Sequence, residues 1–116
     1  MSTDNNVLLV QKLIRLTQSK ELTWHLTPPP PILTKQKDEL IISCYETTYN
    51  NSLFYVYAER YKNYSLDFDQ WYYTERTMIA ALQSDLIVWE YWEQQNLTKE
   101  LLSVASQQIF DINSFL

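Results

Sequence analysis

The sequence predicts an α+β domain: one antiparallel β-meander of about four to five strands, with an N-terminal and a C-terminal helix packed on one face. Three observations support this fold. Apolar residues recur with a helical period near both ends of the chain. Apolar segments of strand length fill the middle, and short turn signals separate them, which favours pairing between successive strands. The 116 residues fit a single domain, 1–116.

The first helix is expected at about residues 5–19. Thr3 or Asp4 can cap its N-terminus, because a short polar side chain accepts a hydrogen bond from the free N–H groups there. Arg15 and Lys20 lie near its end, where positive charge complements the helix dipole. Its apolar stripe consists of Val7, Val10, Ile14 and Thr17.

Residues 22–27 alternate and predict a half-buried strand, with Leu22, Trp24 and Leu26 on one side. The four prolines at 28–31 end this strand because proline cannot donate to a β-ladder. They are interpreted as a stiff connector. The alternative is a polyproline II segment that docks in an aromatic groove.

A hairpin is expected next, formed by residues 39–49 and 52–61. Asn50 and Asn51 between them tolerate positive φ and suit a two-residue turn. This turn predicts that Ile41 lies opposite Arg60 across the hairpin.

The expected register divides the hairpin into two faces, and neither is plainly polar. One face carries Ile41, Ser43, Tyr45, Thr47, Phe54, Val56 and Ala58. The other carries Leu40, Ile42, Cys44, Glu46, Leu53, Tyr55, Tyr57 and Glu59. Such a sheet is either covered on both sides or exposes a binding patch.

The remaining elements follow in order. Residues 63–70 are expected to form a loop, 71–82 a third long strand, and 86–92 a further strand after a turn at 83–85. Asn96 or Thr98 is expected to cap the last helix. The apolar stripe of that helix is Leu97, Leu101, Val104, Ala105, Gln108, Ile109 and Ile112.

Composition excludes several classes of function. The chain contains no glycine, and phosphate-binding loops and the nucleophile turn of α/β-hydrolases require it. The net charge of −5 disfavours nucleic acid and anionic membranes as partners. No apolar run reaches the roughly 20 residues of a membrane span, and no basic n-region precedes the first apolar stretch. A cytoplasmic location is therefore expected.

No catalytic, metal-binding or cofactor-binding residue is assigned. Cys44 and His25 are too few ligands for structural zinc, and Cys44 is interpreted as an inert buried thiol rather than half of a Cys–His dyad. Asp67 and Asp69 are interpreted as a solvated turn. The strand carboxylates are Glu46, Glu59, Glu75 and Glu90. Pairing of Glu46 or Glu59 with Arg60 or Arg76 across the sheet is preferred over catalysis.

The aromatic residues carry the functional hypothesis. Tyr and Trp are enriched at protein interfaces because they bury large areas and keep a polar group. The candidate interaction surface comprises Leu53, Tyr55, Tyr57, Tyr61, Tyr72, Tyr73, Trp89, Tyr91 and Trp92. The leading hypothesis is a non-enzymatic domain that binds a protein partner, with a homodimer expected. The alternative is a small-ligand module with an aromatic-lined pocket between sheet and helices.

Short segments of the chain resemble a group of small bacterial proteins without a known activity. They are LIRLT (13–17), LTW (22–24), YETTY (45–49), VWE (88–90), LLSV (101–104) and the terminal FL. Ser19 and Asp85 stand where that group tends to have glycine in its turns. The resemblance implies a fold of helix, antiparallel sheet and helix, and no function.

Overall fold

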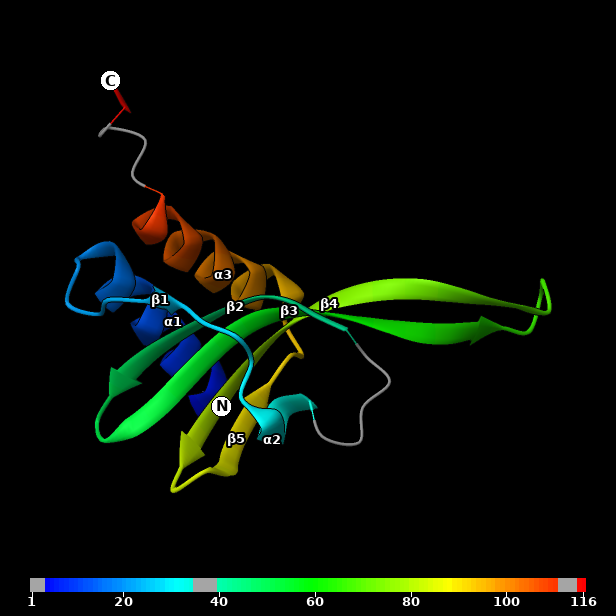
Figure 1. Cartoon of the computed structure of the whole chain (residues 1–116), viewed down its shortest axis with the longest axis horizontal. Coiled ribbons are helices and arrows are strands. Elements are labelled where there is room, and N and C mark those ends of the chain that lie inside the picture. Colours follow the sequence, from blue (N-terminus) through cyan, green and yellow to red (C-terminus); the bar gives the residue numbers. More distant parts are fainter. Residues whose placement is uncertain (1–3, 35–39, 111–114) are drawn as a thin grey trace.

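Five strands form one antiparallel sheet in the order β1-β2-β3-β4-β5. Figure 1 shows this computed structural model, which describes residues 4–34, 40–110 and 115–116. The elements are α1 (Asn5–Gln18), β1 (His25–Leu26), α2 (Pro31–Thr34), β2 (Leu40–Tyr49), β3 (Ser52–Ser65), β4 (Gln70–Gln83), β5 (Leu86–Tyr91) and α3 (Gln95–Ile109). The predicted meander with a helix at each end is confirmed.

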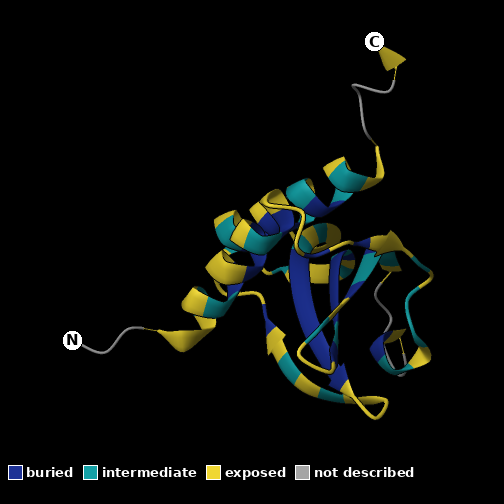
Figure 2. Ribbon diagram, turned by 90° about the vertical axis from the view of Figure 1, so that its left-hand side faces the viewer, coloured by how far each residue is buried: buried dark blue, intermediate teal, exposed yellow. Residues whose placement is uncertain are grey.

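The two long helices, α1 and α3, lie against each other and pack on one face of the sheet (Figures 1 and 2). Burial of apolar surface between the layers stabilises this arrangement, by about 25 cal/mol per Å². The buried residues of this helix-side core are Val10, Leu13, Ile14, Leu22, Trp24, Phe54, Val56, Ile79, Ala81, Tyr91, Leu101 and Ala105.

The two helices begin differently. Asp4 caps α1, as predicted, because its Oδ1 accepts a hydrogen bond from the Asn6 N–H at 2.9 Å. The prediction that Asn96 or Thr98 caps α3 is wrong. Gln94 occupies the N-cap position without a side-chain hydrogen bond, and the next residue, Gln95, bonds both backbone groups of Thr77 in β4. The start of α3 is therefore held by the sheet. Ile112 of the predicted stripe lies outside the described residues.

Gln108 fastens α3 to the segment that follows α1. Its side chain accepts a hydrogen bond from the Trp24 N–H at 3.0 Å and donates to the carbonyls of Thr17 and Leu22 at 2.9 and 2.8 Å. The Trp24 indole donates to the Thr17 hydroxyl. These bonds bind Leu22 and Trp24 to the helices, whereas the carbonyl of Thr23 between them accepts a hydrogen bond from the Thr47 hydroxyl of β2 at 2.7 Å.

The predicted strand at 22–27 is consequently too long. Leu22 and Trp24 are buried in the helix-side core, as expected, but only His25 and Leu26 pair with β2. Leu26 is exposed and does not continue the buried side.

The opposite face of the sheet is covered by α2, which the sequence analysis did not predict. Pro31 begins this helix, and its missing N–H costs little there because backbone N–H groups in the first turn have no partner within the helix. The helix places Leu33 over the sheet. The chain that directly follows the proline connector therefore covers the core on this face. The buried residues of this α2-side core are Leu33, Cys44, Tyr55, Tyr57, Met78, Ala80 and Leu82.

The tight turns use polar residues where glycine is common. Asn50 and Asn51 have φ angles of 49° and 63°, as predicted for the β2–β3 turn. Ser84 and Asp85 have φ angles of 51° and 62° between β4 and β5. Asn and Asp tolerate this left-handed region better than most residues, which explains three of these four positions in a glycine-free chain; Ser84 is the exception.

The predicted register is correct beside the β2–β3 turn and wrong further along. Ile41 pairs with Glu59 and not with Arg60. The cause is a β-bulge at Ser43, whose φ of 55° inserts one unpaired residue into β2. Because side chains alternate between faces, the bulge moves Ile41 to the α2-side core.

The expected loop at 63–70 is wrong. β3 and β4 pair without interruption from Leu53–Leu82 to Ser65–Gln70, and only residues 66–69 form the turn. The pairing of β2 with β3 ends at Arg60, and that of β5 with β4 ends at Ile79. Residues 60–75, called the arm below, therefore project from the body as a two-stranded ribbon (Figure 1).

Replacing Gln108 by alanine is expected to destabilise the fold by about 2 kcal/mol, because three backbone groups lose their hydrogen-bond partner. Urea denaturation followed by circular dichroism measures this change. The control is Gln107→Ala on the adjacent, exposed position, which should change stability by less than about 0.5 kcal/mol. Equal effects of the two substitutions would show that Gln108 does not fasten α3.

Candidate functional site

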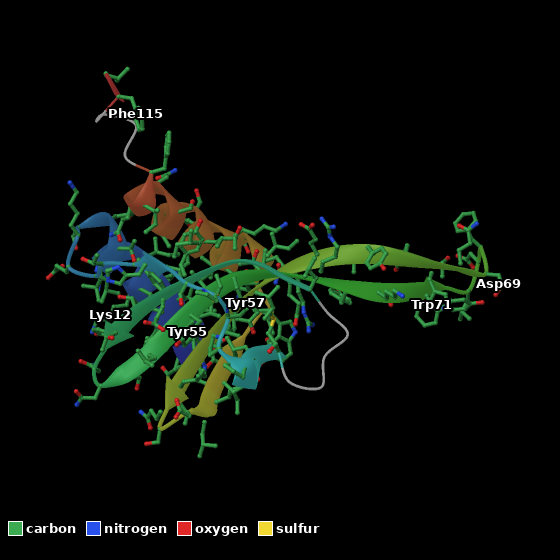
Figure 3. The ribbon with its side chains drawn as sticks, viewed as in Figure 1. Lys12, Tyr55, Tyr57, Asp69, Trp71 and Phe115 are labelled. Carbon is green, nitrogen blue, oxygen red and sulfur yellow. The ribbon has the colours of Figure 1, made fainter. Side chains whose placement is uncertain are left out.

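Three of the nine predicted surface residues, Leu53, Tyr55 and Tyr57, lie on the α2 side of the sheet. Tyr55 and Tyr57 are buried in the α2-side core, and Leu53 packs against it. Figure 3 shows Tyr55 and Tyr57 within the body of the sheet, away from the arm. The structure thus covers these side chains with the chain's own helix.

Two more of the nine, Trp89 and Tyr91, belong to the helix side. Tyr91 is buried, and the ring of Trp89 stacks on it with centroids 6.0 Å apart. The Trp89 indole donates a hydrogen bond to the Asn6 side chain of α1 at 3.0 Å. These aromatics hold β5 against α1.

The other four of the nine lie on the arm or at its base. Tyr61 is partly buried, whereas Tyr72, Tyr73 and Trp92 are exposed. The sequence analysis missed Tyr64, Leu66 and Phe68, which are exposed, because it treated residues 63–70 as a loop. It also left out Trp71, which it placed in a strand and which is exposed as well. A signal was present: aromatic residues flank the four turn residues on both sides, and Tyr64 and Trp71 are equally far from the turn.

One face of the arm consists of three cross-strand pairs. The rings of Tyr64 and Trp71 meet edge to face with centroids 5.2 Å apart, and the Lys62 ammonium lies 5.8 Å from the centre of the Tyr73 ring. The third pair is the ion pair described next. We call this the Trp71 face; it comprises Arg60, Lys62, Tyr64, Trp71, Tyr73 and Glu75. Such pairs hold the ribbon together where no third strand supports it.

Two ion pairs join the strands where the arm leaves the body. Arg60 and Glu75 are 2.6 Å apart, with side chains 45% and 52% exposed. Arg76 and Glu59 are 2.8 Å apart, with side chains 32% and 0% exposed. The predicted cross-strand pairing of Glu59 is confirmed.

Arg76 also organises the aromatic residues at the base of the arm. Its guanidinium lies 4.9 Å from the centre of the Tyr61 ring and 5.7 Å from that of Trp92. A guanidinium over an aromatic face is attracted by the ring quadrupole. Arg76 therefore connects the arm to the segment between β5 and α3.

The tip of the arm combines apolar and acidic side chains. Leu66 and Phe68 are among the most exposed apolar residues in the described chain. Asp67 and Asp69 alternate with them, and Figure 3 shows Asp69 at the far end of the arm beside Trp71. The described residues contain no cluster of three or more histidine, cysteine or acidic side chains that would hold a metal ion.

Cys44 is buried, as the sequence analysis expected of an inert thiol. Burial, and after it the nearby Glu46 carboxylate, raises the pKa of the thiol to about 12. The thiol therefore stays protonated at neutral pH. Glu46 accepts a hydrogen bond from the Tyr55 hydroxyl.

A cleft of about 580 Å³ lies between the C-terminal parts of α1 and α3. Its lining residues are Thr17, Gln18, Lys20, Thr23, Val104, Gln107 and Gln108. This lining contains no aromatic residue and so differs from the aromatic-lined pocket between sheet and helices considered in the sequence analysis.

The two ion pairs at the base of the arm test how burial changes the contribution of an ion pair to stability. Arg76→Leu is expected to lower the free energy of unfolding by about 3 kcal/mol, because it breaks a pair whose carboxylate is fully buried. Arg60→Leu breaks an exposed pair and should cost less than about 1 kcal/mol. Urea denaturation compares them, and equal losses would contradict the assigned role of Glu59.

Tyr57→Phe is expected to stabilise the protein by about 1 kcal/mol, because the buried hydroxyl has no hydrogen-bond partner among the described residues. Burial, followed by the charges of Glu59 and Glu90, raises the pKa of this hydroxyl. The unfolded chain therefore loses the proton first, and stability falls as pH rises above about 10. The variant should lose less stability there.

Thermal unfolding between pH 7 and 11 checks this expectation, with Tyr73→Phe on the exposed arm as the control. A Tyr57→Phe variant that is as sensitive to alkaline pH as the wild type would contradict it.

Comparison with known proteins gives no further guidance. No family model, curated protein or solved structure matches this chain significantly. Among the described residues, no helix is long and apolar enough to cross a bilayer.

Proposed function

We propose that this chain is a non-enzymatic interaction domain that binds a protein partner through the arm. The observation that carries the proposal is the exposure of large apolar side chains on a projecting ribbon. Trp71, Tyr73 and Phe68 are 68%, 65% and 76% exposed. Contiguous exposed apolar surface of this kind is typical of interaction sites.

The energetics support a binding role. Burying one such side chain contributes about 1.5–3 kcal/mol. A partner that covers three of them therefore gains a substantial part of the binding free energy of a micromolar complex. Tyr and Trp are also common binding hot spots. The cross-strand pairs of the Trp71 face hold these side chains in place before binding, which lowers the entropy lost on association.

The chemistry of the arm favours a protein over other partners. Single-stranded nucleic acid stacks on aromatic residues too, but its phosphates require a positively charged groove. Asp67 and Asp69 place negative charge at the tip, and the chain as a whole has a net charge of −5. The same carboxylates oppose insertion of the tip into an anionic membrane.

Three of the groups weighed for catalysis are buried or paired with other side chains, which supports a non-enzymatic role. Cys44 is a buried, protonated thiol, and Glu59 and Glu75 are paired with arginines. The small-ligand alternative receives less support, because the lining of the cleft between α1 and α3 contains no aromatic residue. A thermal-shift screen tests it: a metabolite that raises the melting temperature would favour a ligand-binding role.

Site-specific photo-crosslinking in the host cell tests the proposed function. A benzoylphenylalanine placed at Tyr73 retains an aromatic side chain and should yield protein adducts. The same probe at Leu8, an exposed position of α1 away from the arm, is the control and should yield few (Figure 1). Equal labelling from both positions, or no adduct from Tyr73, would contradict binding through the arm.

A further inference from the structure

We infer that the partner of the arm is a second copy of this chain, whose arm packs antiparallel on the first through the Trp71 face. This inference rests on the proposed function and names its partner. Area, charge and the shape of the remaining sheet edges support it.

The exposed aromatic surface of the arm is large enough to form an interface between two arms. An aromatic side chain offers about 150–250 Å², so the exposed parts of the aromatics on or next to the Trp71 face supply about 500 Å² per arm. The aromatics concerned are Tyr64, Phe68, Trp71 and Tyr73. Two arms together therefore bring about 1,000 Å², which is the area that a specific protein interface should reach.

The charges of the arm are self-complementary. Arg60 and Arg76 are held by carboxylates of the same hairpin. Lys62, in the middle of the Trp71 face, contacts the Tyr73 ring and has no ion pair among the described residues. The carboxylates at the tip are Asp67 and Asp69. The arm thus has a positive middle and a negative end.

Antiparallel packing brings these opposite charges together. A two-fold axis through the Tyr64–Trp71 pair has Lys62 on one side and the tip on the other, each about 7–10 Å away along the strand. The tip of one copy then lies over Lys62 of the other, and the contact occurs twice because a two-fold interface repeats itself. Parallel packing would instead place like charges together, which is unfavourable.

The edges of the sheet are less suited to self-association. β1 has only two residues, and the edge of β2 that it leaves uncovered is interrupted by the bulge at Ser43. The pairing of β4 with β5 is interrupted by a bulge between Ala81 and Leu82, and bulged edges disfavour pairing with another chain. The arm is therefore the better surface for a second copy.

A charge-exchange experiment on the full chain tests this arrangement. In the proposed dimer, the tip of one copy contacts position 62 of the other. Lys62→Glu makes both of these positions acidic, and Asp67→Lys with Asp69→Lys makes both of them basic. Each variant alone should dimerise at least about tenfold more weakly than the wild type in sedimentation equilibrium. An equimolar mixture should regain association, because both contacts then join opposite charges. Trp71→Ser with Tyr73→Ser, checked for folding by circular dichroism, should remain monomeric.

Two results would overturn the inference: a wild-type chain that stays monomeric up to about 100 μM, or a mixture that associates no better than its components. The photo-crosslinks separate this failure from that of the proposed function. A monomer that still yields adducts of Tyr73 with a different protein removes the second copy as partner and retains the arm as a binding surface. A monomer without such adducts contradicts both.

Discussion

The continuous antiparallel ladder between β3 and β4 supports every other part of the molecule. Its inner half carries Phe54 and Val56 toward α1 and α3, and Tyr55 and Tyr57 toward α2. Both cores therefore depend on the same two strands. Its outer half continues beyond the neighbouring strands and becomes the arm. The inner half is buried on both faces, whereas an isolated two-stranded ribbon is only marginally stable. The arm thus depends on the body for its stability.

Elements that show a hydrophobic period over many residues, or that contain residues with a strong conformational preference, were predictable from the sequence. The two long helices follow from apolar stripes over several turns, and the β2–β3 turn follows from Asn50 and Asn51. α2 was not predictable in this way, because four residues are too few to show a helical period. The bulge at Ser43 was equally hidden, since serine has no marked preference for positive φ.

The candidate surface was predictable in part, for a related reason. Alternation in a strand shows which residues share a face, but it does not show what covers that face. Tyr57 and Tyr72 are both tyrosines of long strands, yet Tyr57 lies under α2 and Tyr72 lies in solvent. The difference arises from α2 and from the ends of β2 and β5, which are properties of the tertiary structure. The arm itself was missed because Asn63 and Ser65 are typical loop residues, and their cross-strand pairing with Tyr72 and Gln70 outweighed that local preference.

The left-handed residues in the turns and in the bulge also affect the unfolded chain. Glycine would adopt these conformations with less strain than Asn, Ser or Asp, but it would add conformational freedom to the unfolded state. A chain with no glycine accepts some steric strain at a few positions in the folded state. Without glycine, however, the unfolded chain has fewer accessible backbone conformations, so less backbone entropy is lost on folding. Part of the stability of this fold therefore originates in the unfolded chain, where no contact of the folded structure reveals it.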